Sequence, residues 1–303
     1  MPPQLEKHPI RDPEPSDPYY GRNDHAARRE HRATKLREPH HLRYLPGPIP
    51  DQVEEEDRKI PVREGAEITV RIYRPAKKVA AAATARGRPL VVMYHEGGWA
   101  MGDLSDEEAA KNAASIGADP SAGFIIGRGS AGGNIAAVLA HVARDEGLIS
   151  VPAITCFRRP ELIPERYRDE YLSHPGVTRS EDQGTDPVLK DLEQAEVGLR
   201  MLLKVDTESP LFVPFLFGEK SARGHRDLPA AYLQVCGLGL LRDEGLIYER
   251  VLREEAGVRT RLDLYPGLGH YFWTNYPRLE ASRRFVEDTV QGVKWLLEQQ
   301  QKA

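Results

Sequence analysis

A serine and a histidine that could together perform acyl transfer stand in loops that follow apolar runs of the sequence. Ser130 lies in "FIIGRGSAGGNIAAVLAHVA" (124–143), where a short apolar run leads through glycines into a helix-like repeat, and His270 lies in "YPGLGHYFW". A serine at a sharp strand-to-helix turn can act as a nucleophile, and an imidazole within reach can take its proton. Either residue alone is weak evidence, because glycine-flanked serines and solvated loop histidines are common. Their order along the chain makes the pair a candidate for nucleophilic catalysis.

Two glycines in "HEGGW" (95–99) could complete such a site. Gly97 and Gly98 follow the apolar run "PLVVMY". Glycines at the end of a buried strand let backbone N–H groups point at a ligand oxygen, which is the arrangement of an oxyanion hole. The alternative is an ordinary glycine turn. The sequence therefore offers a nucleophile, a base and oxyanion donors, each after a strand-like segment.

Alternating strand-like and helix-like segments must position these residues. Residues 59–75 predict a two-stranded hairpin, and residues 88–99, 230–238 and 259–268 predict further strands. Apolar residues recur at helical spacing over 135–142, 246–252 and 286–297, and Gly257 is a stop signal for the second of these helices. Strands that alternate with helices indicate a mostly parallel central sheet flanked by helices. Such sheets carry their chemistry at the carboxyl ends of the strands, where the three motifs fall.

Composition excludes several classes of protein. The 303 residues carry 42 Lys and Arg against 46 Asp and Glu, so no basic face for nucleic acid is expected. The chain shows no apolar run long enough for a membrane span and no apolar core of a signal peptide, which predicts a cytoplasmic protein. Cys156 and Cys236 have no paired spacing, and we expect two buried thiols rather than a disulfide or a zinc site.

The first 55 residues differ in composition from the rest of the chain. They are rich in proline, charge and histidine and have little apolar periodicity, which predicts a flexible N-terminal arm or a loosely packed cap. Four histidines in this segment lack partners with ligand spacing, so we expect solvated side chains rather than a metal site; they are His25, His31, His40 and His41. The catalytic domain is expected over 56–303.

The combined motifs resemble the α/β-hydrolase family of the hormone-sensitive-lipase type, and within it a fungal carboxylesterase-like branch. The similarity runs from about residue 58 to the C-terminus through "VMYHEGGWAMGDLSDEE", "SAGGNIAAVLAH", "LPAAYLQVCGL", "LLRDEGLIYERVLREEAGV" and "PGLGHYFW". It implies ester hydrolysis of a small-molecule ester or acyl ligand, without a cofactor. It also implies roles for single residues, with Ser130 as nucleophile, His270 as base, and the N–H groups of Gly97, Gly98 and Ala131 as oxyanion donors. Residues of about 151–228 would form the cap and the acyl pocket. The oligomeric state is not predicted.

One departure from the family removes a catalytic group. Members of the family carry the triad aspartate in a stretch like "GxDPLRDEG", whereas this chain has "GLGLLRDEG", with Gly239 in the aspartate's position. Asp243 and Glu244 are candidate substitutes, but the family keeps that acidic pair in addition to the catalytic residue. The carboxylate fixes the tautomer of the histidine, and losing it costs on the order of 10⁴-fold in rate, or about 5.5 kcal/mol. The triad is therefore predicted to be a dyad.

Other departures concern the scaffold. Arg128 stands where the family has a glycine two residues before the nucleophile, and we expect it to strain or deform the turn. Glu96 replaces the first glycine of the family's oxyanion motif, which is a milder change. Between "GDLSDEE" and "AASIGADPS" the chain lacks the segment that supplies one internal strand of the sheet. The expected fold is thus an α/β-hydrolase with one internal strand missing and a small cap.

Three interpretations stay open from the sequence. The first is a serine esterase with reduced activity, which the presence of both Ser130 and His270 favours. The second is a non-catalytic protein that keeps the acyl pocket and binds a small molecule. The third is a degenerate product without a stable function. Gly239, Arg128 and the missing segment favour the second and third.

Overall fold

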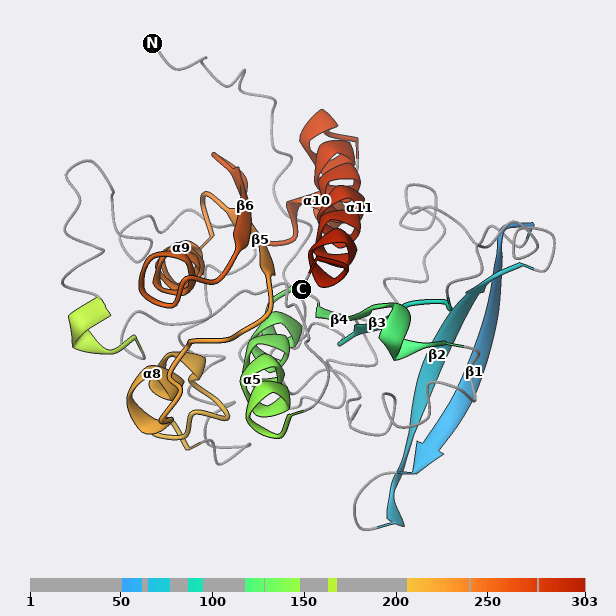
Figure 1. Cartoon of the computed structure of the whole chain (residues 1–303). Coiled ribbons are helices and arrows are strands. Elements are labelled where there is room, and N and C mark those ends of the chain that lie inside the picture. The colour runs from blue at the N-terminus through green and yellow to red at the C-terminus, as the bar shows by residue number, and fades with distance from the viewer. Residues whose placement is uncertain are drawn as a thin grey trace.

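The computed structural model describes residues 51–61, 65–76, 87–94, 118–127, 129–147, 163–167, 206–239, 241–276 and 278–302. Within these ranges the strands form three pairs, and helices cover the two parallel pairs (Figure 1). The strands are β1 (Val53–Pro61), β2 (Glu67–Pro75), β3 (Leu90–Met93), β4 (Phe124–Gly127), β5 (Ala231–Cys236) and β6 (Thr260–Tyr265). The helices are η3 (Pro120–Ala122), α5 (Ala131–Asp145), η6 (Pro214–Leu216), α8 (Phe217–Lys220), α9 (Arg242–Arg250), η7 (Val251–Glu255), α10 (Phe272–Asn275) and α11 (Glu280–Gln300).

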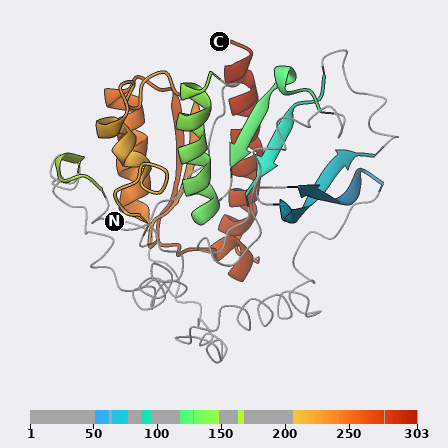
Figure 2. The same ribbon diagram turned by 90° about the horizontal axis from the view of Figure 1, so that it is seen from below.

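The parallel strands lie inside a three-layer arrangement. Every residue of β4 and of β5 is buried, as expected for parallel strands that are covered on both faces. Successive side chains of a strand point to opposite faces. Ile125 of β4 and Tyr232 of β5 meet Leu296 of α11, whereas Ile126 packs against α5 and Leu233 packs with residues of α9. Helix α11 therefore covers one face, and α5 and α9 cover the other (Figure 2).

The long helix α11 shows the direction of β4. Its C-terminal residue Gln300 exchanges two hydrogen bonds with the backbone of Phe124, the first residue of β4, at 3.1 and 2.8 Å. One residue farther along the strand, Ile125 packs against Leu296, which is one turn earlier in the helix. Strand β4 and helix α11 therefore run in opposite directions.

The contacts between α11 and β5 likewise show the direction of β5. Tyr232 lies against Gly292, since a Cβ at Gly292 would be 2.0 Å from its ring. Two residues later, the side-chain oxygen of Gln234 accepts a hydrogen bond from Thr289 at 2.8 Å. Strand β5 thus also runs opposite to α11, so β4 and β5 run the same way. Because β6 is parallel to β5, all three strands point in the same direction.

The N-terminal hairpin is confirmed as two antiparallel strands, with Val53 opposite Pro75 and Pro61 opposite Glu67. Strand β1 begins at Val53, inside the segment expected to form the N-terminal arm, while residues 1–50 lie outside the described ranges. In the part of the chain that the structure describes, β2 pairs with β1, β3 pairs with β4, and no ladder joins β2 to β3. Residues 95–117, which include the place where the segment is expected to be missing, lie outside the described ranges.

Part of the segment expected to form the cap packs onto the body of the domain. Its described apolar residues join one core cluster with β5 and α9; they are Ile163, Tyr167, Val213, Phe215 and Leu216. Within residues 151–205, the structure describes only 163–167. The described part of the predicted cap is therefore continuous with the core under α9.

The remaining expectations about structural elements have clear outcomes. The three predicted helices are present as α5, α9 and α11, although Val286 and Val290 of α11 are half-exposed rather than buried. Gly257 follows the helical segment α9–η7 with a φ of 66°, a left-handed conformation that suits glycine. Cys236 is a buried thiol that forms no disulfide within the described residues, as predicted, and Cys156 lies outside them. No helix within the described ranges is both long enough and apolar enough to cross a membrane.

Candidate active site

Ser130 stands at the junction between β4 and α5. Strand β4 ends at Gly127, and α5 begins at Ala131, so the chain turns from strand to helix within three residues. Ser130 has φ 55° and ψ −131°, and its side chain makes no capping hydrogen bond although it occupies the N-cap position. Serine in that position ordinarily caps the first turn of the helix. The turn therefore leaves the hydroxyl group of this partly exposed residue available for chemistry.

Backbone strain is concentrated beside the two predicted catalytic residues. Three described residues other than glycine have positive φ, namely Ser130, Asp227 and Tyr271, and Tyr271 directly follows His270. A residue held in such a conformation costs on the order of 1–3 kcal/mol, and such residues cluster at active sites. The sharp turn at Ser130 is thus formed. The deformation expected from Arg128, which itself lies outside the described residues, is not visible in the dihedral angles of Ser130.

One of the three predicted oxyanion donors is described. Ala131 is the first residue of α5 and is buried, and its N–H has no backbone acceptor among the described residues. The first N–H groups of a helix have no partner within the helix and carry a partial positive charge. This N–H is therefore suited to bind an oxygen that becomes negative beside Ser130. Gly97 and Gly98, as well as Glu96, lie outside the described residues.

His270 and Gly239 lie in two neighbouring loops. His270 follows β6, is 5% exposed, and its ring packs edge-on against Tyr271 with centroids 4.4 Å apart. Gly239 follows β5 and is buried. The loops are joined directly, because the N–H of Leu238 donates to the carbonyl of Leu268 at 3.0 Å. The position that lacks the family's aspartate is therefore held next to the loop that carries the predicted base.

Ser130, Gly239 and His270 come from the same end of the parallel strands. Each follows the carboxyl end of its strand, respectively β4, β5 and β6, and these strands run in the same direction. In open α/β sheets this edge is where ligands bind. Three of the predicted positions therefore follow the same end of the two parallel strand pairs.

The two candidate substitutes for the aspartate occupy the first turn of α9. Asp243 is 2% exposed and forms an ion pair with the guanidinium of Arg242, whose Nε lies 2.8 Å from the carboxylate. Arg242 also donates to the carbonyl of Gly237 at 3.3 Å. Glu244 is buried beside them. The charge of Asp243 is therefore already balanced by Arg242.

Sequence reasoning did not identify the polar residues that hold α5. Asn134, four residues after Ser130, is buried and donates to the carbonyl of Phe212 at 3.0 Å. His141 and His225 form a buried pair with a distance of 2.9 Å between ring nitrogens. A polar residue inside an otherwise apolar helical pattern was the available signal for Asn134 and His141. For His225 the sequence gives no such pattern.

Nothing in the described residues provides a metal centre. No group of three or more His, Cys, Asp or Glu side chains in these ranges could hold a metal ion. The four N-terminal histidines and the first 50 residues lie outside the described part.

Comparisons with known proteins agree with this arrangement. Residues 107–274 match the family model described as the α/β-hydrolase fold. An AB hydrolase superfamily protein of Schizosaccharomyces pombe is 31% identical over 297 residues, covering 82% of each chain. Versiconal hemiacetal acetate esterase of Dothistroma septosporum is 35% identical over 200 residues, covering 63% of this chain and 56% of the esterase.

A solved structure shows the same architecture over nearly the whole chain. The crystal structure of vibralactone cyclase superposes with a TM-score of 0.73 at 28% identity, covering 95% of this chain and 92% of the cyclase. Among the curated relatives, besides the Dothistroma protein, are carboxylesterases of Mycobacterium tuberculosis. The chain therefore belongs to the α/β-hydrolase fold family.

Proposed function

We propose that this protein hydrolyses carboxylic esters through an acyl-enzyme formed on Ser130, with His270 as general base and no cofactor. The observation that carries the proposal is the conformation of Ser130, with positive φ at the start of α5 and a hydroxyl group that is not used for capping. A strained serine at a strand-to-helix turn is the arrangement that exposes a nucleophile above a parallel sheet. The esterases among its relatives support the same reaction class.

In the first step of this mechanism, the Oγ atom of Ser130 attacks the carbonyl carbon of the ester while His270 takes the hydroxyl proton. The carbonyl oxygen becomes an oxyanion, which the N–H groups of Ala131, Gly97 and Gly98 would stabilise. The bond to the alkoxy group then breaks, and His270 returns the proton to the leaving alcohol. Water activated by His270 hydrolyses the acyl-enzyme in the second half of the cycle.

The same mechanism predicts a reduced rate. Gly239 supplies no carboxylate to the loop beside His270, and Asp243 is ion-paired with Arg242. Without a carboxylate, the histidine tautomer is not fixed and the imidazolium is not stabilised. Rate enhancement then depends on the oxyanion donors and on substrate positioning, which still give about 10³–10⁴-fold over water in serine proteases.

A fluorophosphonate probe and a short-chain p-nitrophenyl ester test the proposal. The wild-type protein should become labelled at Ser130 and should release p-nitrophenol, and Ser130→Ala should abolish both signals. Ser121→Ala is a matched control, because Ser121 precedes the same strand and donates to Asp119 outside the turn. Labelling or hydrolysis that persists in Ser130→Ala would refute the assignment.

The second candidate function, non-catalytic binding of an acyl compound, is favoured by Gly239, by Arg128 and by the missing segment. A binder should show a higher melting temperature with a short-chain acyl ligand but no turnover and no probe labelling, since ligand binding to the folded state raises its stability. Turnover that is lost in Ser130→Ala would exclude this alternative.

A further inference from the structure

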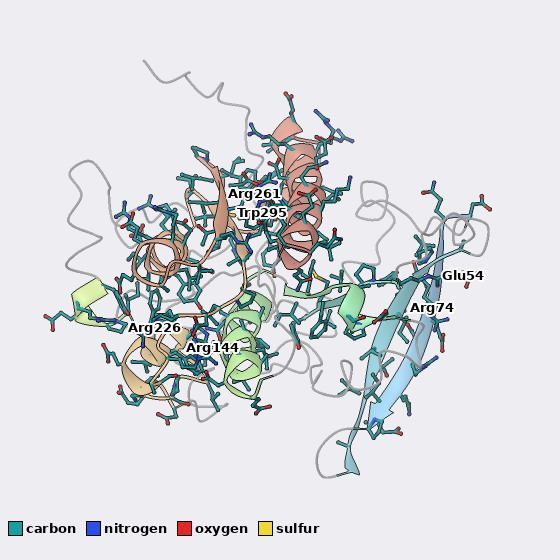
Figure 3. All side chains as sticks on the ribbon, in the orientation of Figure 1. Glu54, Arg74, Arg144, Arg226, Arg261 and Trp295 are labelled. Carbon is teal, nitrogen blue, oxygen red and sulfur yellow. The ribbon has the colours of Figure 1, made fainter. Side chains whose placement is uncertain are left out.

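Helix α5 is held on its side away from α11 by hydrogen bonds to the segment between Asp206 and Asp227. Three buried residues of the helix make these contacts: Asn134, His141 and Arg144. Their partners are the carbonyl of Phe212 at 3.0 Å, the ring of His225 at 2.9 Å, and the carbonyls of Gly224 and Arg226 at 2.8 and 2.7 Å. Figure 3 shows Arg144 and Arg226 next to each other between α5 and α8.

The central contact joins two histidines whose proton positions follow from their partners. Nδ1 of His141 lies 2.8 Å from the carbonyl oxygen of Ala137, which can only accept, so Nδ1 carries the hydrogen. In the neutral ring Nε2 is then an acceptor, and it must receive the hydrogen bond from Nδ1 of His225. The pair thus forms a directed chain from His225 through His141 to the backbone of α5.

Their surroundings keep both rings neutral. His141 is fully buried and stacks on Phe217 with ring centroids 4.2 Å apart, and His225 is 5% exposed. Burial lowers the pKa of His141 to about 3, assisted by His225, and lowers the pKa of His225 to about 4, assisted by the charge of Arg144. The directed hydrogen bond is therefore intact at neutral pH.

The small side chains of α5 make its hydrogen bonds important for fixing the orientation of the helix. Seven of the eleven buried residues of the helix are alanine or glycine; they are Ala131, Gly132, Gly133, Ala136, Ala137, Ala140 and Ala143. Small side chains form shallow ridges, which hold a helix close to its neighbours but interlock little. Hydrogen bonds to fixed carbonyls and rings then contribute most to fixing the rotation and tilt of the helix.

A small tilt of α5 would misplace the nucleophile. His141 lies eleven residues after Ser130, which corresponds to roughly 16 Å along the helix. A rotation of about 4° about the histidine contact would move Ser130 by about 1 Å, and a displacement of about 1 Å costs on the order of 10²-fold in rate. The strained backbone of Ser130 also needs surroundings that hold it in place.

We propose that His141 and His225 are positioning residues for catalysis, which hold α5 through their hydrogen bond so that Ser130 stays aligned with the substrate carbonyl. This inference rests on the proposed role of Ser130 as nucleophile. Neither histidine touches the substrate in this scheme. Their effect should therefore fall on the chemical step and not on substrate affinity.

A matched pair of variants at His225 tests this. In His225→Asn the side-chain amide nitrogen takes the place of Nδ1 and can still donate to His141, whereas His225→Leu has the same branching without a donor. We expect kcat on a short-chain p-nitrophenyl ester to fall about tenfold or more in His225→Leu with KM within about twofold, and to return to within about threefold of wild type in His225→Asn. Arg226→Gln is the control, because the Arg226 side chain is exposed in the same loop and donates to Ala222.

The outcomes separate this inference from the proposed function. Should His225→Leu fail to unfold cooperatively, His225→Gln replaces it, because its amide nitrogen lies one bond farther from the backbone and cannot take the place of Nδ1. An active wild type with equal kcat in the Asn variant and in the donor-free variant would overturn the positioning role alone. A folded wild type that neither hydrolyses the ester nor labels at Ser130 would overturn the proposed function and this inference with it.

Discussion

Restoring a carboxylate at residue 239 should raise the rate of ester hydrolysis. The backbone can accept the change, since Gly239 is absent from the described glycines with positive φ. The loop is held on both sides, because the N–H of Gly239 donates to the carbonyl of Cys236 and its own carbonyl accepts from Arg242, each at 3.0 Å. Gly239→Asp therefore introduces the side chain at a fixed point beside the loop of His270.

The size of the gain follows from two opposing effects. The ceiling is about 10⁴-fold, or about 5.5 kcal/mol, which is the cost of losing the carboxylate in a serine protease triad. The position is buried, so the new carboxylate loses hydration and must recover that cost from His270. A misplacement of about 1 Å would remove about 10²-fold of the gain. We expect an increase in kcat/KM between about 10²-fold and 10⁴-fold.

The assay is kcat/KM on a short-chain p-nitrophenyl ester for the wild type, Gly239→Asp, Gly239→Asn and Gly239→Asp combined with Ser130→Ala. The asparagine variant has the same shape without the charge and should gain less than about tenfold, and the combined variant should be inactive. An increase below about threefold in a Gly239→Asp protein that unfolds cooperatively would refute the reasoning. In that case Arg128→Gly should be required first, as expected if Arg128 deforms the turn.

Further predictions concern stability. Gly292→Ala should lower the free energy of unfolding by about 1–3 kcal/mol or prevent folding, because a Cβ would lie 2.0 Å from the fully buried ring of Tyr232; an unchanged urea midpoint would contradict this. Because the pKa values of His141 and His225 are about 3 and 4 in the folded chain and about 6.5 in the unfolded chain, the unfolded chain binds more protons between these values. The free energy of unfolding should therefore fall as the pH decreases from about 6.5 to about 3, and His225→Asn should flatten this dependence in urea titrations. Asn134→Leu should cost about 1–3 kcal/mol, since it removes the part-buried hydrogen bond to the carbonyl of Phe212; equal stability of the variant and wild type would show that water replaces the amide.

The elements that carry the candidate catalytic residues were predictable because their signals are local. A continuous apolar run followed by glycines and a helical repeat places Ser130 between β4 and α5, and the same logic places His270 after β6. The helical repeat of α11 was also visible, but its boundary was not. The apolar pattern predicted that Val286 and Val290 face the core, but both are half-exposed. The helix contacts the strands through Leu296 and through Gln300.

The contacts that position the site could not be predicted, because they join distant parts of the chain. The bond between His141 and His225 spans 84 residues, and the one from Asn134 to Phe212 spans 78. Neither follows from the spacing within one helix or strand. Likewise the sequence shows that Gly239 lacks a carboxylate, but the contact between its loop and that of His270 depends on how β5 and β6 pair.

The two hydrogen bonds between Phe124 and Gln300 have a consequence for the way this protein is made. They join residues 176 positions apart, and α11 also supplies the Leu296 side chain that meets both Ile125 and Tyr232. During synthesis on the ribosome, β4 and β5 emerge long before the helix that covers their shared face. Their apolar side chains on that face remain uncovered until α11 has been synthesised. Chains with such non-local pairings fold slowly, and in the meantime they expose surfaces that are prone to aggregation. Emergence of α11 from the ribosome, rather than emergence of the loops that carry Ser130 and His270, should therefore set the moment at which this domain becomes resistant to proteases.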